Sequence, residues 1–207
     1  MTFDFLTTFG RRRDKYHSFL QLISKEVEGV DFRIEVSDRP SSKAIVIAPH
    51  GGGIEPGTSE IARRAAGNDF SFYLFEGTKR GGGNRKLHIT SHNFDEPTCL
   101  ELVGKASVVV AVHGCKGPTS GIHIGGLDQS LKESLGEELS AEGLPVVMDS
   151  AKYPASDHRN ICNRGTRQSG AQLEITRDLR KDPSADRIAR AIRRAIEAHH
   201  LFLQSTA

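Results

Sequence analysis

The sequence lacks any uninterrupted apolar span approaching about 18 residues, the length that a membrane-crossing helix requires. Its first residues, MTFDFLTTFGRRRDKYHSF, place polar side chains before the arginines and contain no apolar core of signal-peptide length. We therefore expect a protein that is made in the cytoplasm, has no signal peptide and has no membrane partner.

Cysteine is also scarce. Cys99, Cys115 and Cys162 lie far apart, show no C-x-x-C spacing of the metal-binding kind, and are odd in number. This pattern does not indicate a disulfide framework, so free thiols are expected.

An excess of charge of one sign is missing as well. The chain has 28 basic and 26 acidic residues, a formal net charge of +2, which gives no general argument for a nucleic-acid partner. The basic segment 184–204 places apolar residues at three- and four-residue steps, which predicts an amphipathic helix with its arginines in solvent. The apolar positions are Ile188, Ile192, Ala195, Ile196 and Leu203.

The 207 residues are enough for one domain with a full hydrophobic core, and no segment resembles a linker. We expect a single catalytic domain over residues 1–207, with its core at about residues 28–204. Periodicity predicts strands at DFRIEV, KAIVIA, FSFYLF, LHIT, ASVVVAVHG, LPVVMD and AQLEIT, and helices around residues 15–27, 60–67, 96–105, 127–143 and 184–204. Alternating strands and helices predict an α/β fold, a mostly parallel sheet with helices on both faces in three layers.

Two of these expected strands end in histidine. IVIAPH ends at His50, VVVAVHG ends at His113, and Glu55 follows the glycine turn after His50. Ligand sites of open α/β sheets lie beyond the carboxyl ends of the strands, so the two imidazoles should meet at one edge. Two histidines and a carboxylate, with one position left for water, are the ligand set of a catalytic zinc, Zn²⁺. A single strand-end histidine is more often an ordinary loop residue, but two at equivalent positions favour the metal.

A metal-assisted hydrolysis also needs a base. Glu174, in the middle of AQLEIT, could accept a proton from water and pass it to a leaving amine. Periodicity alone favours neither hypothesis for Glu174: a catalytic base at the site or an ordinary strand residue that faces solvent.

Five segments together resemble one family. IVIAPHGGGIEPGTSEIA, LHITSHNFDEPTCLELV, VVVAVHG, and NICNRG with QLEIT are similar to the poly-γ-glutamate hydrolases, zinc enzymes of bacteriophages and some bacteria. The similarity runs in matching order from about residue 28 to about residue 180. It implies an open mixed sheet flanked by helices, similar to zinc carboxypeptidases, with His50, Glu55 and His113 as metal ligands and Glu174 as the catalytic base. The H-x-x-x-x-E spacing departs from the H-x-x-E of the peptidases themselves.

The substrate implied by this resemblance carries one free α-carboxylate per residue, so the cleft should offer cations. Arg164 and Asn163, within NICNRG, are the expected carboxylate anchors, and Arg164 is also expected to act in catalysis. His92 is a weaker candidate for substrate contact. We expect the nearby Asp95 to cap the following helix. The remaining loop cations are expected to be solvated.

The resemblance and the residues together predict a hydrolase of γ-glutamyl amide bonds in poly-γ-glutamate, endo-acting and monomeric. It would meet an extracellular polymer after cell lysis. The alternatives are a hydrolase of another γ-glutamyl or N-acyl amino acid, a thiol hydrolase with Cys115 beside His113, and a non-catalytic polyanion-binding module.

Overall fold

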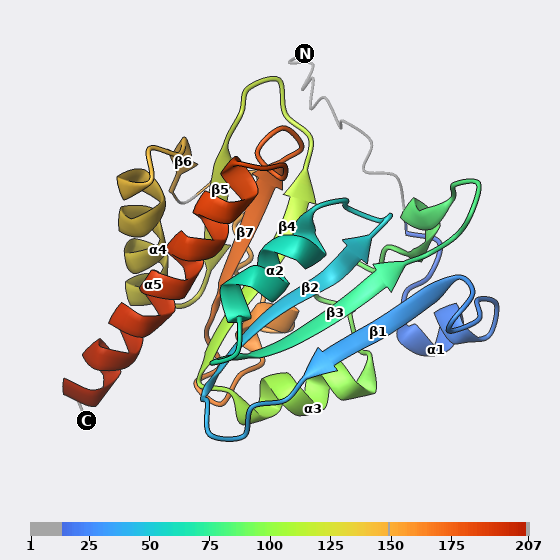
Figure 1. The fold of residues 1–207 in the computed structure, drawn as a ribbon. Coiled ribbons are helices and arrows are strands. Elements are labelled where there is room, and N and C mark those ends of the chain that lie inside the picture. The colour runs from blue at the N-terminus through green and yellow to red at the C-terminus, as the bar shows by residue number, and fades with distance from the viewer. Residues whose placement is uncertain (1–13, 149, 206–207) are drawn as a thin grey trace, which may run out of the picture.

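The computed structural model describes residues 14–148 and 150–205 of the chain. Its strands are β1 Phe32–Ser37, β2 Ala44–Gly52, β3 Ser71–Gly77, β4 Val108–Cys115, β5 Ile122–Gly126, β6 Val146–Val147 and β7 Ala171–Thr176. They form one seven-stranded sheet in the order β1-β3-β2-β4-β7-β5-β6 (Figure 1). The four central strands β3, β2, β4 and β7 are parallel to their neighbours in this group, whereas β1 and β5 run antiparallel to β3 and β7. The carboxyl ends of the central strands therefore share one edge.

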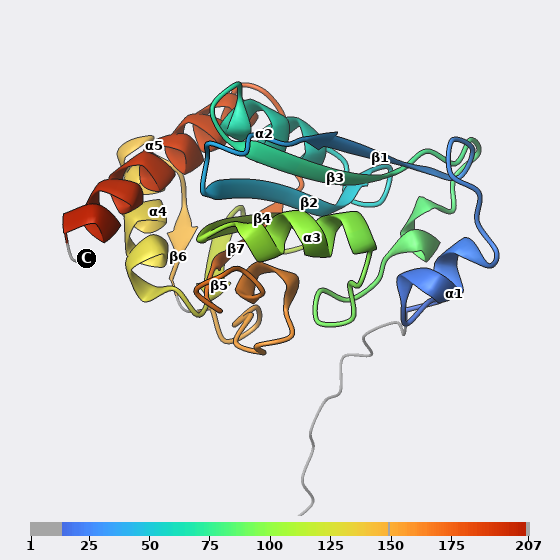
Figure 2. The same cartoon turned by 90° about the horizontal axis from the view of Figure 1, so that it is seen from below.

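Helices cover both faces of the sheet (Figure 2). The helices are α1 Phe19–Ile23, α2 Thr58–Ala66, α3 Pro97–Lys105, α4 Gln129–Ala141 and α5 Ser184–Ser205, with short 3₁₀ helices η1 Asn84–Leu87 and η2 Ile161–Asn163. Apolar residues of α2, α4 and α5 pack on one face, and those of α1, α3, η1 and η2 pack on the other. This is the expected three-layer α/β architecture with an open mixed sheet.

The central strands are buried on both faces, which explains why their sequences read as continuous apolar runs. In β4, Val110 and Val112 belong to the core beneath α2, α4 and α5, and Val109 and Ala111 belong to the core on the opposite face. Side chains alternate in the same way along β7. Leu173 and Ile175 belong to the core beneath α2, α4 and α5, so Gln172 and Glu174 face the side that α3 covers. That face holds the candidate site.

Most predicted elements are confirmed, three predicted elements need correction, and one strand was not predicted. LHIT forms no strand: Leu87 is the last residue of η1, and residues 88–90 are irregular. LPVVMD contributes only the two residues of β6, and the helix expected over residues 15–27 is limited to α1. The strand β5 was not predicted, because its five residues IHIGG end in two glycines and offer almost no periodicity.

The start of α3 also differs from the prediction. Glu96 is its N-cap, and the Glu96 carboxylate accepts hydrogen bonds from the backbone N–H groups of Thr98 and Cys99. Asp95 instead accepts the backbone N–H of Phe19, and so ties α1 to the start of α3. The capping role belongs to the neighbouring carboxylate because a cap must reach the second and third helical N–H groups.

The closing helix α5 confirms the amphipathic prediction. Ile188, Ile192, Ala195 and Ile196 are fully buried in the core, and Leu203 packs against it. Arginines on the other side meet acidic residues of α4 and its C-cap: Arg190 and Arg194 hydrogen-bond the C-cap Glu142, and Arg194 also bonds Glu138. The basic helix is thus neutralised by its neighbour.

None of the helices in the described ranges has the length and apolar character needed to cross a bilayer. The signal-peptide expectation rests largely on residues 1–13, which lie outside the described residues.

Candidate metal centre and catalytic site

A β-bulge near the end of β2 decides where His50 points. Ala48 pairs with Leu74 and Gly51 with Glu76, so β2 contains one more residue than β3 over this span. Without the extra residue, His50 would face α2 like Ala48, two positions earlier. The bulge turns the imidazole of His50 to the opposite face, where it meets His113.

Gly51 takes the place beneath α2 that this shift creates. A Cβ built on Gly51 would lie 2.1 Å from Ser59 Oγ and 3.1 Å from the carbonyl oxygen of Phe75. Only glycine fits there, which gives the glycine run after His50 a packing reason. The Ser59 hydroxyl also accepts the backbone N–H of Gly52 and so fixes α2 against the turn.

Glu55 returns from this turn to the end of β4. Its backbone N–H donates to the carbonyl of His50, at 2.9 Å, and its carboxylate accepts the backbone N–H of Gly114, at 2.7 Å. The carboxylate is thereby held next to His113, the residue before Gly114. The sequence expectation that the glycines bend Glu55 back toward His50 agrees with this geometry.

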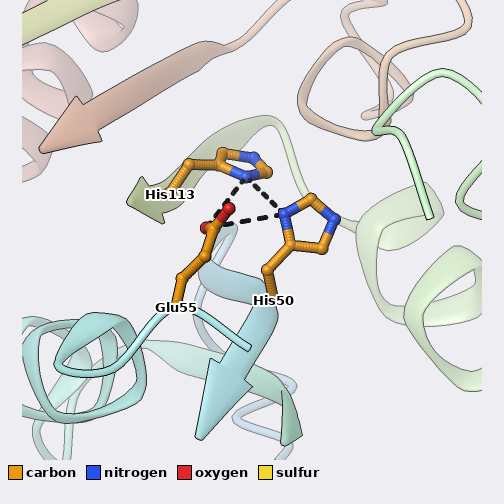
Figure 3. Close-up of side chains that lie close together, drawn as sticks. All are labelled: His50, Glu55 and His113. Atoms are coloured by element: carbon orange, nitrogen blue, oxygen red, sulfur yellow. Dashed lines mark hydrogen bonds and ion pairs between the residues drawn. The ribbon is translucent and has the colours of Figure 1, made fainter. Parts of the chain in front are cut away.

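Three potential ligand atoms, one from each of His50, Glu55 and His113, lie within 4.8 Å of one another (Figure 3). The two Nδ1 atoms are 3.0 Å apart, and Glu55 Oε2 lies 3.5 Å from His50 Nδ1 and 3.9 Å from His113 Nδ1. Tetrahedral zinc places adjacent ligand atoms roughly 3.3 Å apart. The spacing and the donor types therefore fit a zinc ion held by three protein ligands.

The other ring nitrogens of both histidines face one loop, residues 89–91. His50 Nε2 lies 2.8 Å from the carbonyl oxygen of Ile89, and His113 Nε2 lies 3.5 Å from Ser91 Oγ. A carbonyl partner on Nε2 leaves Nδ1 of His50 with its lone pair toward the centre. These outer contacts are those that orient metal-binding histidines.

A second imidazole supports His50. The ring of His88 lies with its centroid 4.0 Å from that of His50, and His88 Nδ1 is 2.7 Å from the Asp14 carboxylate. Asp14 also accepts the backbone N–H and hydroxyl of Thr90. Asp14, near the start of the chain, thus holds in place the loop 89–91 that contacts His50 and His113.

The charges of this centre suit metal binding. Burial lowers the pKa of His113 to about 3, so its imidazole is neutral at physiological pH. Burial alone would raise the pKa of Glu55, but the nearby His50 and His113 rings and the Gly114 N–H lower it to about 2. Burial opposes a proton on His50, but the Glu55 charge and the hydrogen bonds of the ring together outweigh burial and raise the pKa of His50, so a metal would bind there in place of that proton. A neutral imidazole and an ionised carboxylate are the protonation states that coordinate a metal.

Glu174 lies beside this centre. It pairs with His113 across β4 and β7, and both side chains are on the α3 face. Gln172 Nε2 donates to Glu174 Oε1 at 3.1 Å, and Gln172 Oε1 accepts from Asn160 Nδ2 at 3.0 Å. Burial, followed by the charge of Glu55, raises the pKa of Glu174 to about 8. A carboxyl group that is half-buried, oriented and poised near neutrality has the properties of a general base.

Arg180, which the sequence analysis did not single out, is the buried cation of this edge. Its side chain is 8% exposed, and one of its terminal nitrogens donates to the carbonyl of Pro56, next to Glu55. The guanidinium lies on Gly114, where an added Cβ would be 2.6 Å from Cζ, and its buried Nε has no hydrogen-bond partner among the described residues. Its charge acts on both Glu55 and Glu174. The only hint in the sequence is its position four residues after a strand that ends at the site edge.

The two expected carboxylate anchors have other surroundings. The Asn163 amide is 1% exposed, and it donates to the carbonyls of Ala155 and Asp157 and accepts from the N–H groups of Leu127 and Gly170. These bonds use both donors and both acceptor positions, so Asn163 organises its loop. Arg164 is half-buried, and its charge acts on the Cys99 thiol of α3. A role for Arg164 in substrate binding or catalysis stays a prediction.

His92 directly follows Ser91, which contacts His113 of the candidate metal centre, and the His92 side chain is half-buried. Its contact with substrate also stays a prediction. Among the loop cations expected to be solvated, Lys79 is instead largely shielded and paired with Glu26 and Asp31. Arg159 pairs with Asp157 but stays exposed, and Arg167 pairs with Asp128.

The thiol alternative finds no support in the surroundings of Cys115. All three cysteines are free and buried. Burial and the charge of Glu174 raise the pKa of Cys115 to about 11, so the group is a neutral thiol near pH 7. A catalytic cysteine requires the thiolate.

Known proteins share this fold and sequence. The chain is 37% identical over 170 residues to the YndL protein of Bacillus subtilis (strain 168), a match that covers 81% of this chain and 66% of YndL. A prophage-derived relative from the same bacterium, YoqZ, is 33% identical over 82% of this chain and 61% of its own length. The chain thus spans about two thirds of the length of these curated relatives.

Solved structures of related proteins share the fold of this chain. A bacteriophage poly-gamma-glutamate hydrolase superposes with a TM-score of 0.86 at 32% identity, over 92% of this chain and 100% of that one. A zinc-free structure of YndL gives 0.82 at 30% identity, over 89% and 98%. An N-formylglutamate amidohydrolase from Ralstonia eutropha, at 0.52 and 11% identity, shares the fold alone. The family model for poly-gamma-glutamate hydrolase matches residues 16–199, and the chain belongs to this family.

Proposed function

We propose that this protein is a zinc-dependent hydrolase of the γ-glutamyl amide bonds of poly-γ-glutamate. The observation that carries the proposal is the meeting of His50, Glu55 and His113 beside Glu174 in a chain of this family. The arrangement combines a three-ligand metal site with a half-buried carboxyl group on the same face of the sheet. Endo-acting cleavage and a monomeric state are parts of the proposal that rest on the sequence resemblance and expectation.

The metal site would be formed by His50 and His113 through Nδ1 and by the carboxylate of Glu55. When bound, zinc polarises the substrate carbonyl and lowers the pKa of the attacking water. The backbone N–H of Gly114 and the carbonyl of Ile89 hold two of these ligands in place. The protein thereby fixes the geometry before substrate arrives.

Glu174 would move the proton. It accepts a proton from the attacking water and returns it to the nitrogen of the leaving amine, so that one carboxylate serves both steps. The hydrogen bond from Gln172 favours its ionised form and sets its direction. A nearby divalent cation lowers the pKa of a carboxyl group further, which keeps the base ionised at neutral pH.

Arg180 would supply positive charge where a polyanionic substrate needs it. Its guanidinium lies on the Gly114 backbone, and its charge acts on Glu55 and Glu174. A buried guanidinium offsets the repulsion between these carboxylates and a substrate that carries one α-carboxylate per residue. It also fixes the Pro56 carbonyl, and with it the turn that presents Glu55.

The test is cleavage of the polymer by purified protein. The protein is stripped of metal with a chelator, dialysed, and assayed with poly-γ-glutamate before and after addition of one equivalent of zinc, with chain length followed by size-exclusion chromatography. We expect no cleavage of the stripped protein, recovery with zinc, and an early fall in mean chain length. Poly-α-glutamate, which has the same charge per residue, serves as the matched control and should stay intact.

Three outcomes would contradict the proposal. Equal cleavage of both polymers would remove the γ-glutamyl specificity. Full cleavage by protein shown to be free of metal would remove the zinc. Binding of the polymer without cleavage in the zinc-loaded protein would favour the polyanion-binding module.

A further inference from the structure

The unpredicted strand β5 brings a third histidine to the site. His123 pairs with Glu174 across β5 and β7, while His113 pairs with Glu174 across β4 and β7. The three residues therefore form one row over three adjacent strands, on the same face of the sheet. His123 lies on the side of Glu174 that faces away from the metal centre.

The imidazole of His123 is held in one orientation. Its Nδ1 lies 3.0 Å from Oγ of Ser150, a residue that is only 7% exposed. Burial and the charge of Lys152 lower the pKa of His123, so the ring is neutral near pH 7. The tautomer in which the serine hydroxyl donates to Nδ1 carries its proton on Nε2, and in this tautomer Nε2 is a hydrogen-bond donor.

Gly121 keeps space open beside this donor. It immediately precedes β5, so it lies at the edge of the sheet where the carboxyl end of the antiparallel strand β7 also lies. A Cβ on Gly121 would be 3.7 Å from His123 Nε2. The donor thus lies next to a residue without a side chain, at the edge where the candidate site lies.

Lys152 is placed beside His123 by the ring of Tyr153. The Tyr153 and His123 rings meet edge to face with centroids 5.2 Å apart, and Lys152 Nζ lies 4.9 Å from the Tyr153 centroid. Lys152 Nζ donates to the carbonyl of Lys116 at 3.4 Å, and among the described residues it forms no ion pair with a carboxylate. Its charge nevertheless acts on Glu174 and Cys115, which places it near the site.

We propose that His123 Nε2 and Lys152 Nζ form a subsite for the free α-carboxylate of a γ-linked glutamyl residue next to the scissile amide. The inference rests on the proposed function. The two donors belong to a neutral, oriented imidazole and a flexible ammonium group, a combination that suits a carboxylate with one fixed and one adaptable contact. They lie on the opposite side of Glu174 from the metal ligands, so a substrate carboxylate there would put the amide between subsite and metal. An α-linked chain carries no carboxylate at this position, and the subsite therefore selects the γ linkage.

Two variants remove the donors and keep the packing. His123→Phe retains a ring against Tyr153, and Lys152→Met retains the aliphatic stem. Lys43→Met is the matched control, because Lys43 is an exposed lysine just before β2, at the opposite end of the sheet. The substrates are a γ-linked glutamate oligomer and its analogue in which the α-carboxylates are α-amides.

On the carboxylate oligomer, each site variant should raise KM about tenfold with kcat within about threefold, as expected for the loss of one charge-assisted hydrogen bond. On the amide analogue, the site variants should match the wild type, and Lys43→Met should match it on both substrates. Equal losses on both substrates, or an undiminished preference for the carboxylate oligomer, would overturn the subsite. A purely structural role of His123 or Lys152 predicts the equal losses.

Calorimetric titration of metal-stripped protein with the same oligomers separates this inference from the proposed function. If the wild type cleaves neither oligomer, the proposed function fails. Tighter binding of the carboxylate oligomer that is lost in Lys152→Met would still support the subsite, and equal binding of the two oligomers would contradict it.

Discussion

Two glutamates at the site have opposite environments, and this contrast assigns their roles. Glu55 accepts a backbone N–H and lies against two imidazoles, which hold the pKa of its carboxyl group near 2. Glu174 is half-buried beside that negative charge, and desolvation together with the Glu55 charge raises its pKa to about 8. The environments push the two pKa values apart, as in other sites where one carboxylate binds or stabilises charge and another transfers protons.

Glu174→Gln tests this assignment. The amide keeps the size and hydrogen-bonding reach of the side chain but cannot accept a proton, so turnover should fall by a factor on the order of a hundred or more. Zinc content and thermal stability should not change, and affinity for a polycarboxylate should hold or rise because a negative charge is removed. Turnover, metal analysis and calorimetric binding on the one variant check all three points. Near-normal turnover would leave the base unidentified, and loss of zinc would make Glu174 a ligand or the support of one.

Arg180 and Arg164 compete for the role of the cation at this site. Arg180→Met should lower kcat/KM by about 2–4 kcal/mol of transition-state stabilisation, because it removes a buried charge beside Glu55 and Glu174. Arg180→Lys should recover part of this loss, since the charge returns without the planar guanidinium. Arg164→Met, measured in parallel, should have the smaller effect. A larger rise in KM for Arg164→Met than for Arg180→Met would restore the sequence-based assignment.

At the scale of elements, the bulge in β2 links the fold to the site. Gly51→Ala would bring a Cβ to within 2.1 Å of Ser59 Oγ, so either α2 or the bulge must move. We expect a loss of about 1–3 kcal/mol of unfolding free energy and weaker metal binding, because His50 is the residue before Gly51.

Gly104→Ala in α3 is the control. Apart from the adjoining residues and the backbone of its own helix, no described atom lies within 4 Å of the added Cβ, and alanine favours a helix, so stability should hold or rise slightly. Chemical denaturation and zinc affinity measure both effects, and an unaltered zinc affinity in Gly51→Ala would separate the bulge from the site.

The sequence predicts the elements that are long and apolar, and it misses those set by long-range contacts. The strand-end histidines could be found because β2 and β4 are continuous apolar runs that stop at a glycine. The bulge could not, since it depends on the register between β2 and β3. Strand β5 and with it His123 were missed because pairing with β7, not local propensity, makes IHIGG a strand. Arg180 was missed because its burial follows from packing on Gly114, about 66 residues away in the chain.

At the scale of the whole molecule, the placement of charge matters more than its total. The net charge is only +2, and the arginines of α5 pair with acidic residues of α4 and its C-cap on the face away from the metal centre. Arg180 and Lys152 are the cations whose charges act on Glu174. If the proposed function holds, local charge at the site should attract the polyanion, and this attraction should weaken as salt rises.

The central claim is that His50, Glu55 and His113 together hold one zinc ion. The most direct measurement is the zinc content of zinc-reconstituted, dialysed protein by elemental analysis, for the wild type, Glu174→Gln, His50→Ala and His113→Ala, with folding checked by circular dichroism. We predict about one zinc per chain in the wild type and Glu174→Gln, and loss of zinc together with activity in folded His50→Ala and His113→Ala. Stoichiometric zinc retained by either histidine variant, or full activity in a folded variant free of zinc, would contradict the account.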